Sequence, residues 1–149
     1  MADPEVLSMM DDLDEIPPDL LPAWIRRSME QGWSGRLPPH AAANLRRVWD
    51  AGITVVVGSD AGNIGTLHGP AIFREMASMV RAGLTPLEVL RAATLNGADV
   101  MGLGEQAGRI EPGALADLVL LDADPLLDIS NLSRVQRVIA KGRVLPASH

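Results

Sequence analysis

The chain has 149 residues, of which 47% are hydrophobic and 21% are charged, with a formal net charge of −6 and no cysteine. This composition suits one domain with a sizeable core, while the acidic balance argues against nucleic acid and anionic membranes as partners. The lack of cysteine excludes disulfides, thiolate zinc sites and cysteine nucleophiles. Because the sequence contains neither a signal-peptide pattern nor an apolar run of about 20 residues, we expect a soluble, cytoplasmic protein.

Residues 1–39 are expected to form an irregular region with one helix. Acidic residues crowd around Pro17 and Pro18 in this region, and their spacing matches no calcium-binding loop, so a solvated acidic loop explains them better than a cation site. A second helix is predicted from His40 to Ala51, with Gly52 as its stop.

The run Ile53–Val57 is apolar or β-branched throughout and enters a glycine-rich turn, which predicts a parallel strand buried on both faces. Ligands of α/β sheets bind beyond the carboxyl ends of such strands, where this sequence places Ser59, Asp60 and His68. A carboxylate at that position can bind a cation or take a proton from a metal-bound water. Asp60 is therefore the main candidate site residue.

The turn has three other interpretations. Asp60 beside glycine and serine could simply cap a turn or the next helix. A phosphate-binding loop is a poor match, since the glycines do not fit G-x-G-x-x-G and no Walker lysine follows. Ser59 as a nucleophile lacks a histidine and acid that the sequence would place beside it.

Two or three helices are predicted after the turn. Pro70 can open a helix with an apolar stripe that includes Met76 and Met79, which we interpret as core residues rather than ligands of a soft metal, and Gly83 ends it. Thr85–Glu88 forms a capping box for a helix that runs to about Ala93. Thr94 is expected to cap a further short helix through Met101. Helices that follow a buried strand predict an α/β fold.

From Gly104 the pattern changes to short strands and turns. Strands are predicted at 109–110, 117–121, 135–140 and 143–145, with Lys141–Gly142 as a hairpin turn, which together make an antiparallel β appendage. Asp122, Asp124 and Asp128 lie around Pro125, and Asp-Pro turns explain them better than a metal cluster does.

Several short motifs, in order over residues 40–145, resemble the end of a metal-dependent amidohydrolase, in the imidazolonepropionase-like and Xaa-Pro dipeptidase-like branch. The motifs are Gly58-Ser59-Asp60-Ala61-Gly62, His68-Gly69, 82–88, 93–98, 108–113, 116–119 and 141–144. The resemblance implies that residues 1–103 are the C-terminal part of a (β/α)₈ TIM-like barrel, with 1–39 irregular and 40–103 forming its last helix, strand and helices. It also implies that residues 104–149 are strands of a small β-sandwich.

The resemblance also implies the chemistry. Asp60 matches the aspartate at the end of the eighth barrel strand, which binds a divalent metal, expected to be zinc, and accepts a proton from the attacking water. His68 lies in a loop from which such enzymes contact substrate, and the substrate would be a small amide, cyclic amide or dipeptide. The other metal ligands of the family have no counterpart here, because the sequence contains only His40, His68 and His149.

A complete barrel takes about 250 residues, so we expect this chain to be a C-terminal fragment that is inactive alone. The alternative is a non-catalytic binding or structural remnant that self-associates, as a homo-oligomer or through the open barrel edge. A small nucleotide-binding α/β protein is a third hypothesis, and it rests on the glycine-rich turn alone.

Overall fold

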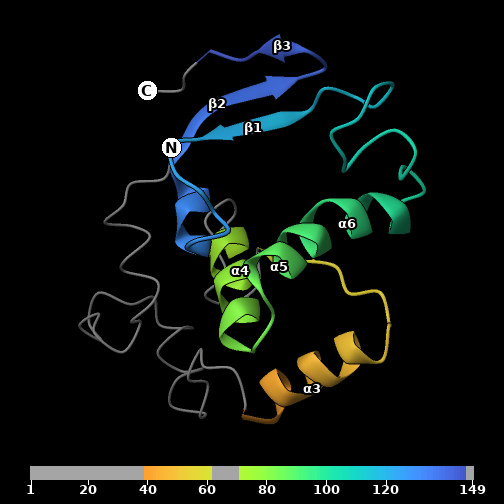
Figure 1. Ribbon diagram of the computed structural model, residues 1–149, viewed down its shortest axis with the longest axis vertical. Coiled ribbons are helices and arrows are strands. Elements are labelled where there is room, and N and C mark those ends of the chain that lie inside the picture. The colour runs from red at the N-terminus through yellow and green to blue at the C-terminus, as the bar shows by residue number, and fades with distance from the viewer. Residues whose placement is uncertain (1–38, 62–70, 147–149) are drawn as a thin grey trace, which may run out of the picture.

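The computed structural model describes residues 39–61 and 71–146 (Figure 1). Helices occupy one end of these residues and a three-stranded sheet the other, as Figure 1 shows. In chain order the elements are α3 (Pro39–Asp50), α4 (Ala71–Arg81), α5 (Pro86–Ala93), α6 (Leu95–Val100), β1 (Leu118–Leu121), the 3₁₀ helix η2 (Ile129–Ser133), β2 (Val135–Ala140) and β3 (Arg143–Val144).

The core lies where α4, α5 and η2 meet. Val89 and Ala92 of α5 are fully buried, Met79 of α4 is 3% exposed, and Ile129 of η2 closes the cluster. Trp49 of α3 packs against the same cluster from outside. The prediction that the α4 methionines are core residues is confirmed, because Met76 and Met79 are both buried. The unbranched thioether side chain suits the irregular gaps between packed helices.

The predicted helix ends are mostly confirmed. Gly52 and Gly83 have φ values of +73° and +101°, the left-handed conformation that ends a helix at little cost for glycine. At the start of α5 the Glu88 backbone N–H donates to Thr85 Oγ1 at 3.3 Å, and the Glu88 carboxylate accepts the Thr85 N–H at 2.7 Å. This is the predicted capping box.

Thr94 does not cap α6 as predicted. Its hydroxyl donates to the Leu90 carbonyl at 2.7 Å, one turn back in α5, and α6 has no side-chain cap. A threonine at the end of one helix can satisfy its hydroxyl within that helix, and this local bond prevails here over capping the next one.

Residues 53–57 do not form the predicted strand. They have no regular secondary structure, and the side chains of Ile53 and Val56 are 58% and 41% exposed rather than buried on both faces. A parallel strand exists only as part of a ladder, and residues 39–61 and 71–146 contain no parallel neighbour to pair with it. Val55 and Val57 nevertheless pack against the core, so one side of the segment is covered.

The antiparallel appendage is confirmed, with strand order β1-β2-β3. Lys141 and Gly142 both have positive φ, 50° and 76°, as a two-residue hairpin turn of type I′ requires. Asp117 lies just before β1, and its carboxylate accepts the Lys141 N–H at 2.6 Å. Asp117 therefore holds the turn between β2 and β3.

The predicted strand at Arg109–Ile110 is wrong. These residues lie in an irregular loop between α6 and β1, and Ile110 is 89% exposed. Gly108, with φ +78°, explains the turn, because a Cβ there would lie 2.7 Å from the Thr94 carbonyl oxygen. The loop therefore lies against Thr94 and Ala98 at Gly108, where a side chain would not fit.

None of the helices in the described residues has the length and apolar character of a membrane span.

Candidate functional site

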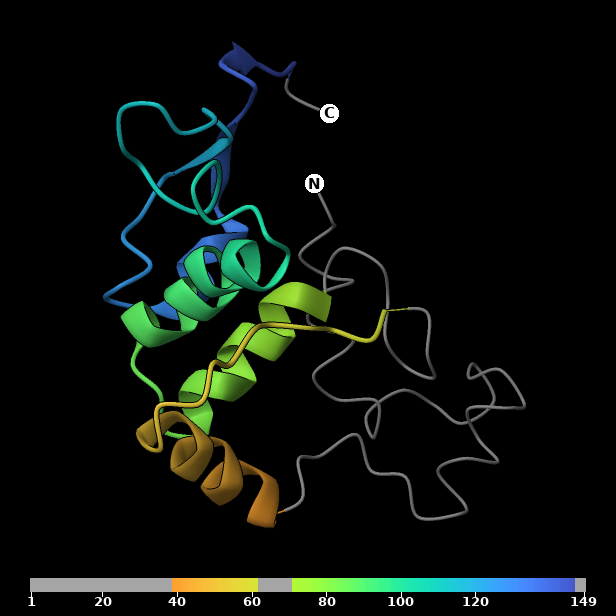
Figure 2. The ribbon, with the colours of Figure 1, turned by 90° about the vertical axis from the view of Figure 1, so that its right-hand side faces the viewer.

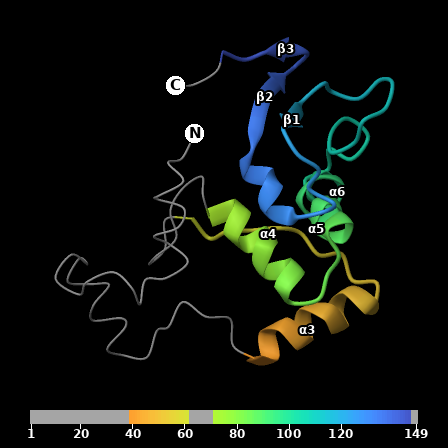
Figure 3. The same ribbon diagram turned by 60° about the vertical axis from the view of Figure 1, so that its left-hand side comes forward.

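Residues 51–61 leave α3 and pass α4 and α5 (Figures 2 and 3). In sequence, Asp60 lies near the end of this segment. The side chain is exposed, and the residue has φ +49°. This left-handed conformation is uncommon for residues other than glycine, and aspartate is among those that tolerate it. The backbone therefore turns sharply at Asp60, and the residue is exposed.

Two kinds of contact hold the segment that carries Asp60. Its packing comes from Val55 and Val57, which face the core. Its hydrogen bonds run to α5 and α6, because the Asn96 side-chain amide donates to the Val55 carbonyl at 2.9 Å and the Val57 N–H donates to the Ala92 carbonyl at 3.4 Å. The candidate site is thus supported by α5, whose Val89 and Ala92 are fully buried.

Of the other residues predicted around Asp60, the structure describes only Ser59. His68 and the glycines at 62 and 65 lie outside the described residues. Ser59 is half-buried next to Asp60. The proposed substrate contact of His68 stays a prediction.

The described residues do not make a metal site by themselves. In 39–61 and 71–146 no three or more His, Asp and Glu side chains gather as metal ligands would. Catalytic zinc sites usually use three protein ligands, and Asp60 supplies one oxygen donor. Any metal held by Asp60 needs ligands from outside the described residues.

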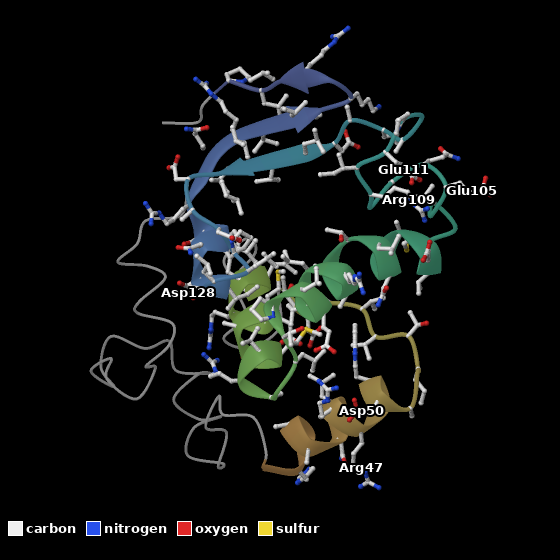
Figure 4. All side chains as sticks on the ribbon, in the orientation of Figure 1. Arg47, Asp50, Glu105, Arg109, Glu111 and Asp128 are labelled. Carbon is white, nitrogen blue, oxygen red and sulfur yellow. The ribbon has the colours of Figure 1, made fainter. Side chains whose placement is uncertain are left out.

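Two of the three acidic residues around Pro125, Asp124 and Asp128, act in turns, as predicted. The Asp124 carboxylate accepts the Leu126 N–H at 2.8 Å. The carboxylate of Asp128, which Figure 4 labels, accepts the Ser130 N–H at 2.9 Å at the start of η2. The Ser130 N–H also holds the pKa of Asp128 below its ordinary value. These carboxylates are occupied by backbone donors, which explains their density without a metal.

Arg46 fixes α3 to the turn between α4 and α5. Its guanidinium donates to the Gly83 carbonyl at 3.2 Å and to the Glu88 carboxylate at 3.3 Å, and it also pairs with Asp50 one turn along α3. The Thr85 backbone N–H and then Arg46 lower the pKa of Glu88, while the hydrogen bond from Arg46 lowers the pKa of Asp50. Because α3 leads directly into residues 53–60, this network sets where the Asp60 segment begins.

The lowered pKa of Glu88 predicts how stability depends on pH. A carboxylate whose pKa is lower in the folded state stabilises that state at pH values above its ordinary pKa, here 4.5. This contribution is lost as the pH falls through the pKa of the folded state. Glu88→Gln keeps a capping side chain but cannot ionise. We expect wild type to lose about 0.5 kcal/mol more than Glu88→Gln between pH 7 and pH 4, the size of an exposed ion pair. Urea unfolding at both pH values measures this, with exposed Glu105→Gln as the control. Equal losses in wild type and Glu88→Gln would contradict the prediction.

Arg109 organises the loop between α6 and β1. It pairs with Glu111 at 3.3 Å and with Asp99 of α6 at 3.7 Å, and Figure 4 shows Arg109 and Glu111 close together in that loop. Its Nε is buried without a hydrogen-bond partner within the described ranges. Arg109 therefore links this loop to α6 through Asp99.

Sequence analysis missed Asn96, Arg46 and Arg109. Asn96 was visible only as a polar residue inside the motif 93–98, and Arg46 only as a residue on the polar side of its helix. Their partners lie 41 and 42 residues away in sequence, at Val55 and Glu88, and no local pattern indicates such contacts.

Comparison with known proteins identifies the relatives of this chain. Residues 34–145 match the sequence profile of the amidohydrolase family. The imidazolonepropionase of Geobacillus sp. (strain WCH70) is 33% identical over 136 residues, which are 83% of this chain and 32% of that protein. The chain therefore spans about a third of the length of this relative.

Solved structures agree. A candidate prolidase from Bifidobacterium longum superposes with a TM-score of 0.66 at 33% identity, over 73% of this chain and 28% of its own. A Xaa-Pro dipeptidase with bound methionine in its active site superposes with a TM-score of 0.68 over 96% of this chain and 33% of its own, at 24% identity, which establishes a shared fold alone. The helices and the small sheet described above therefore have the arrangement of part of an amidohydrolase.

Proposed function

The chain belongs to the amidohydrolase family, in its imidazolonepropionase-like and Xaa-Pro dipeptidase-like branch, and on that premise we propose that it is the C-terminal part of a metal-dependent hydrolase of C–N bonds. The substrate class is a small amide, cyclic amide or dipeptide. The observation that carries the proposal is Asp60, an exposed carboxylate at a sharp backbone turn, at the end of a segment held against the core.

In this proposal Asp60 binds a divalent metal, expected to be zinc, and accepts the proton of the attacking water. The metal, when bound, supplies a water of lowered pKa and polarises the carbonyl oxygen. The remaining ligands come from parts of the enzyme outside the described residues, together with the strands of the (β/α)₈ barrel that would pair with residues 53–57. Residues 1–103 belong to the barrel and residues 104–149 to a β-sandwich in this assignment, and His68 contributes to substrate binding.

The proposal predicts that the purified chain has no amidohydrolase activity by itself. One carboxylate oxygen cannot hold a catalytic metal with an open coordination position, so the activated water is not formed. The assay uses added zinc or manganese with a panel of amides and Xaa-Pro dipeptides, before and after the rest of an amidohydrolase barrel is supplied on the same or another chain. Activity only after this addition, abolished by Asp60→Ala, supports the proposal. Turnover by the isolated chain that chelator and Asp60→Ala both abolish would contradict its predicted inactivity.

A second candidate function is non-catalytic self-association. The exposed side chains of Ile53 and Val56 favour it, since an apolar segment without strand partners among the described residues tends to find one in another chain. Both candidates start from the same segment, and they differ in whether Asp60 is needed for what the chain does.

A further inference from the structure

The segment that carries Asp60 receives a side-chain hydrogen bond from a distant element. Within residues 39–61 and 71–146 no strand pairs with residues 53–57, so their carbonyl oxygens lack the ladder partners of a sheet. The Asn96 side-chain amide, 41 residues along the chain, donates to the Val55 carbonyl at 2.9 Å. Val57, two residues further, reaches the Ala92 carbonyl at 3.4 Å, which is a longer and weaker bond.

Asn96 connects the segment at Val55 to α6, which directly follows the buried helix α5. It is half-buried in the first turn of α6, directly after α5, whose residues Val89 and Ala92 are fully buried. The bond to Val55 is partly buried, which strengthens it relative to a fully solvated one. The acceptor, Val55, precedes Asp60 by five residues on the side of the segment that packs against the core.

We propose that Asn96 is a positioning residue for Asp60, which it fixes through the backbone of Val55. This inference rests on the proposed function, because it assigns Asn96 a part in the work of the Asp60 carboxylate. Asn96 itself touches no reacting atom. Its contribution is to restrict where the turn at Asp60 lies, and small displacements of a positioned group lower rates strongly.

The bond can be tested on the chain as it is, by hydrogen–deuterium exchange of the Val57 backbone amide, which donates to the Ala92 carbonyl two residues beyond the acceptor Val55. Asn96→Ala removes the donor to Val55, and we expect the Val57 amide to exchange about three- to tenfold faster, the effect of losing one typical hydrogen bond. Asn131→Ala is the matched control, because the Asn131 amide donates to the Asp124 carbonyl at the same distance, 2.9 Å, in a different loop. It should leave exchange at Val57 unchanged.

A second variant keeps the test informative if Asn96→Ala is poorly folded. Asn96→Asp has nearly the same shape, but its ionised carboxylate cannot donate to the Val55 carbonyl, whereas its protonated form can. Protection of the Val57 amide relative to wild type should therefore be lost at pH 7 and recover near pH 4, around the ordinary pKa of an aspartate of about 3.9. A general loss of packing would not recover in acid. Unchanged exchange in both variants, or unfolding of both while Asn131→Ala stays folded, would overturn the proposal.

The catalytic part is measured in an active enzyme that contains this chain. Asn96→Ala should lower kcat about tenfold or more with little change in KM, since it displaces a group used in the chemical step. Asp60→Asn is measured beside it. If Asp60→Asn has no effect, the proposed function fails; if Asp60→Asn is damaging and Asn96→Ala retains wild-type kcat, only the positioning role of Asn96 fails.

Discussion

Asp60→Asn is expected to lower kcat by about 10²–10⁴-fold in an active enzyme that contains this chain, with a much smaller change in KM. Asparagine preserves the shape of the side chain but removes its charge and nearly all of its basicity. If Asp60 is a metal ligand and the proton acceptor, both losses act on the transition state more than on substrate binding. The measurement is steady-state kinetics together with the metal content of the purified protein.

The Asp60→Asn variant separates two roles of Asp60, because a purely structural turn residue predicts the opposite result. Asp60 has φ +49°, a conformation that asparagine tolerates as well as aspartate. A purely structural turn residue should therefore accept Asp60→Asn with little loss of rate or stability. Ser59→Ala, at the half-buried neighbour, is the control for disturbance of the turn itself. An Asn variant that keeps both its metal and a near-normal rate would remove Asp60 from the catalytic role.

The helices and the hairpin could be predicted because local signals determine them. The capping box of Thr85 and Glu88, the glycine stops and the hairpin turn at Lys141–Gly142 each depend on residues within a few positions of one another. In each case the bond or dihedral angle expected from the sequence is the one that forms. The apolar stripe of α4 belongs to the same class, since its 3.6-residue period can be read without knowing its partner.

The segment 53–57 marks where local prediction stops. Its unbroken apolar run is typical of a central barrel strand, and such a strand needs neighbours on both sides to exist. With no parallel neighbour among the described residues, the same run packs Val55 and Val57 on the core and exposes Ile53 and Val56. The apolar run 53–57 thus indicates a strand between two neighbouring strands, and the described residues do not provide those neighbours.

The contacts that place the candidate site were beyond sequence reasoning for a related reason. Asn96 and Arg46 reach partners that are about 40 residues distant, and the choice of partner follows from how helices pack. Asp60 itself could be identified, since its position after an apolar run and its family motif are local. What supports Asp60 could not, because Asn96 looks like any polar residue at the start of a short helix.

Self-association is the second large effect that we expect, and it follows from the exposed side of the same segment. At tens of micromolar, light scattering should find dimers or larger assemblies of the isolated chain, because burying an apolar side chain contributes about 1.5–3 kcal/mol. Val56→Lys, at an exposed position away from the core, should weaken assembly by about tenfold or more without loss of helical content. Adding Ile53→Lys should weaken it further.

The sheet provides the control for this experiment. Val119 of β1 is 57% exposed, close to the 58% of Ile53, so Val119→Lys introduces the same charge at a comparably exposed apolar position. If assembly runs through residues 53–57, Val119→Lys leaves it intact while Val56→Lys disrupts it. The reverse order would move the interface to the sheet. A chain that is monomeric at every concentration, with no binding of a dye for apolar surface, would contradict self-association, since the exposed valines and isoleucine would then be tolerated without a partner.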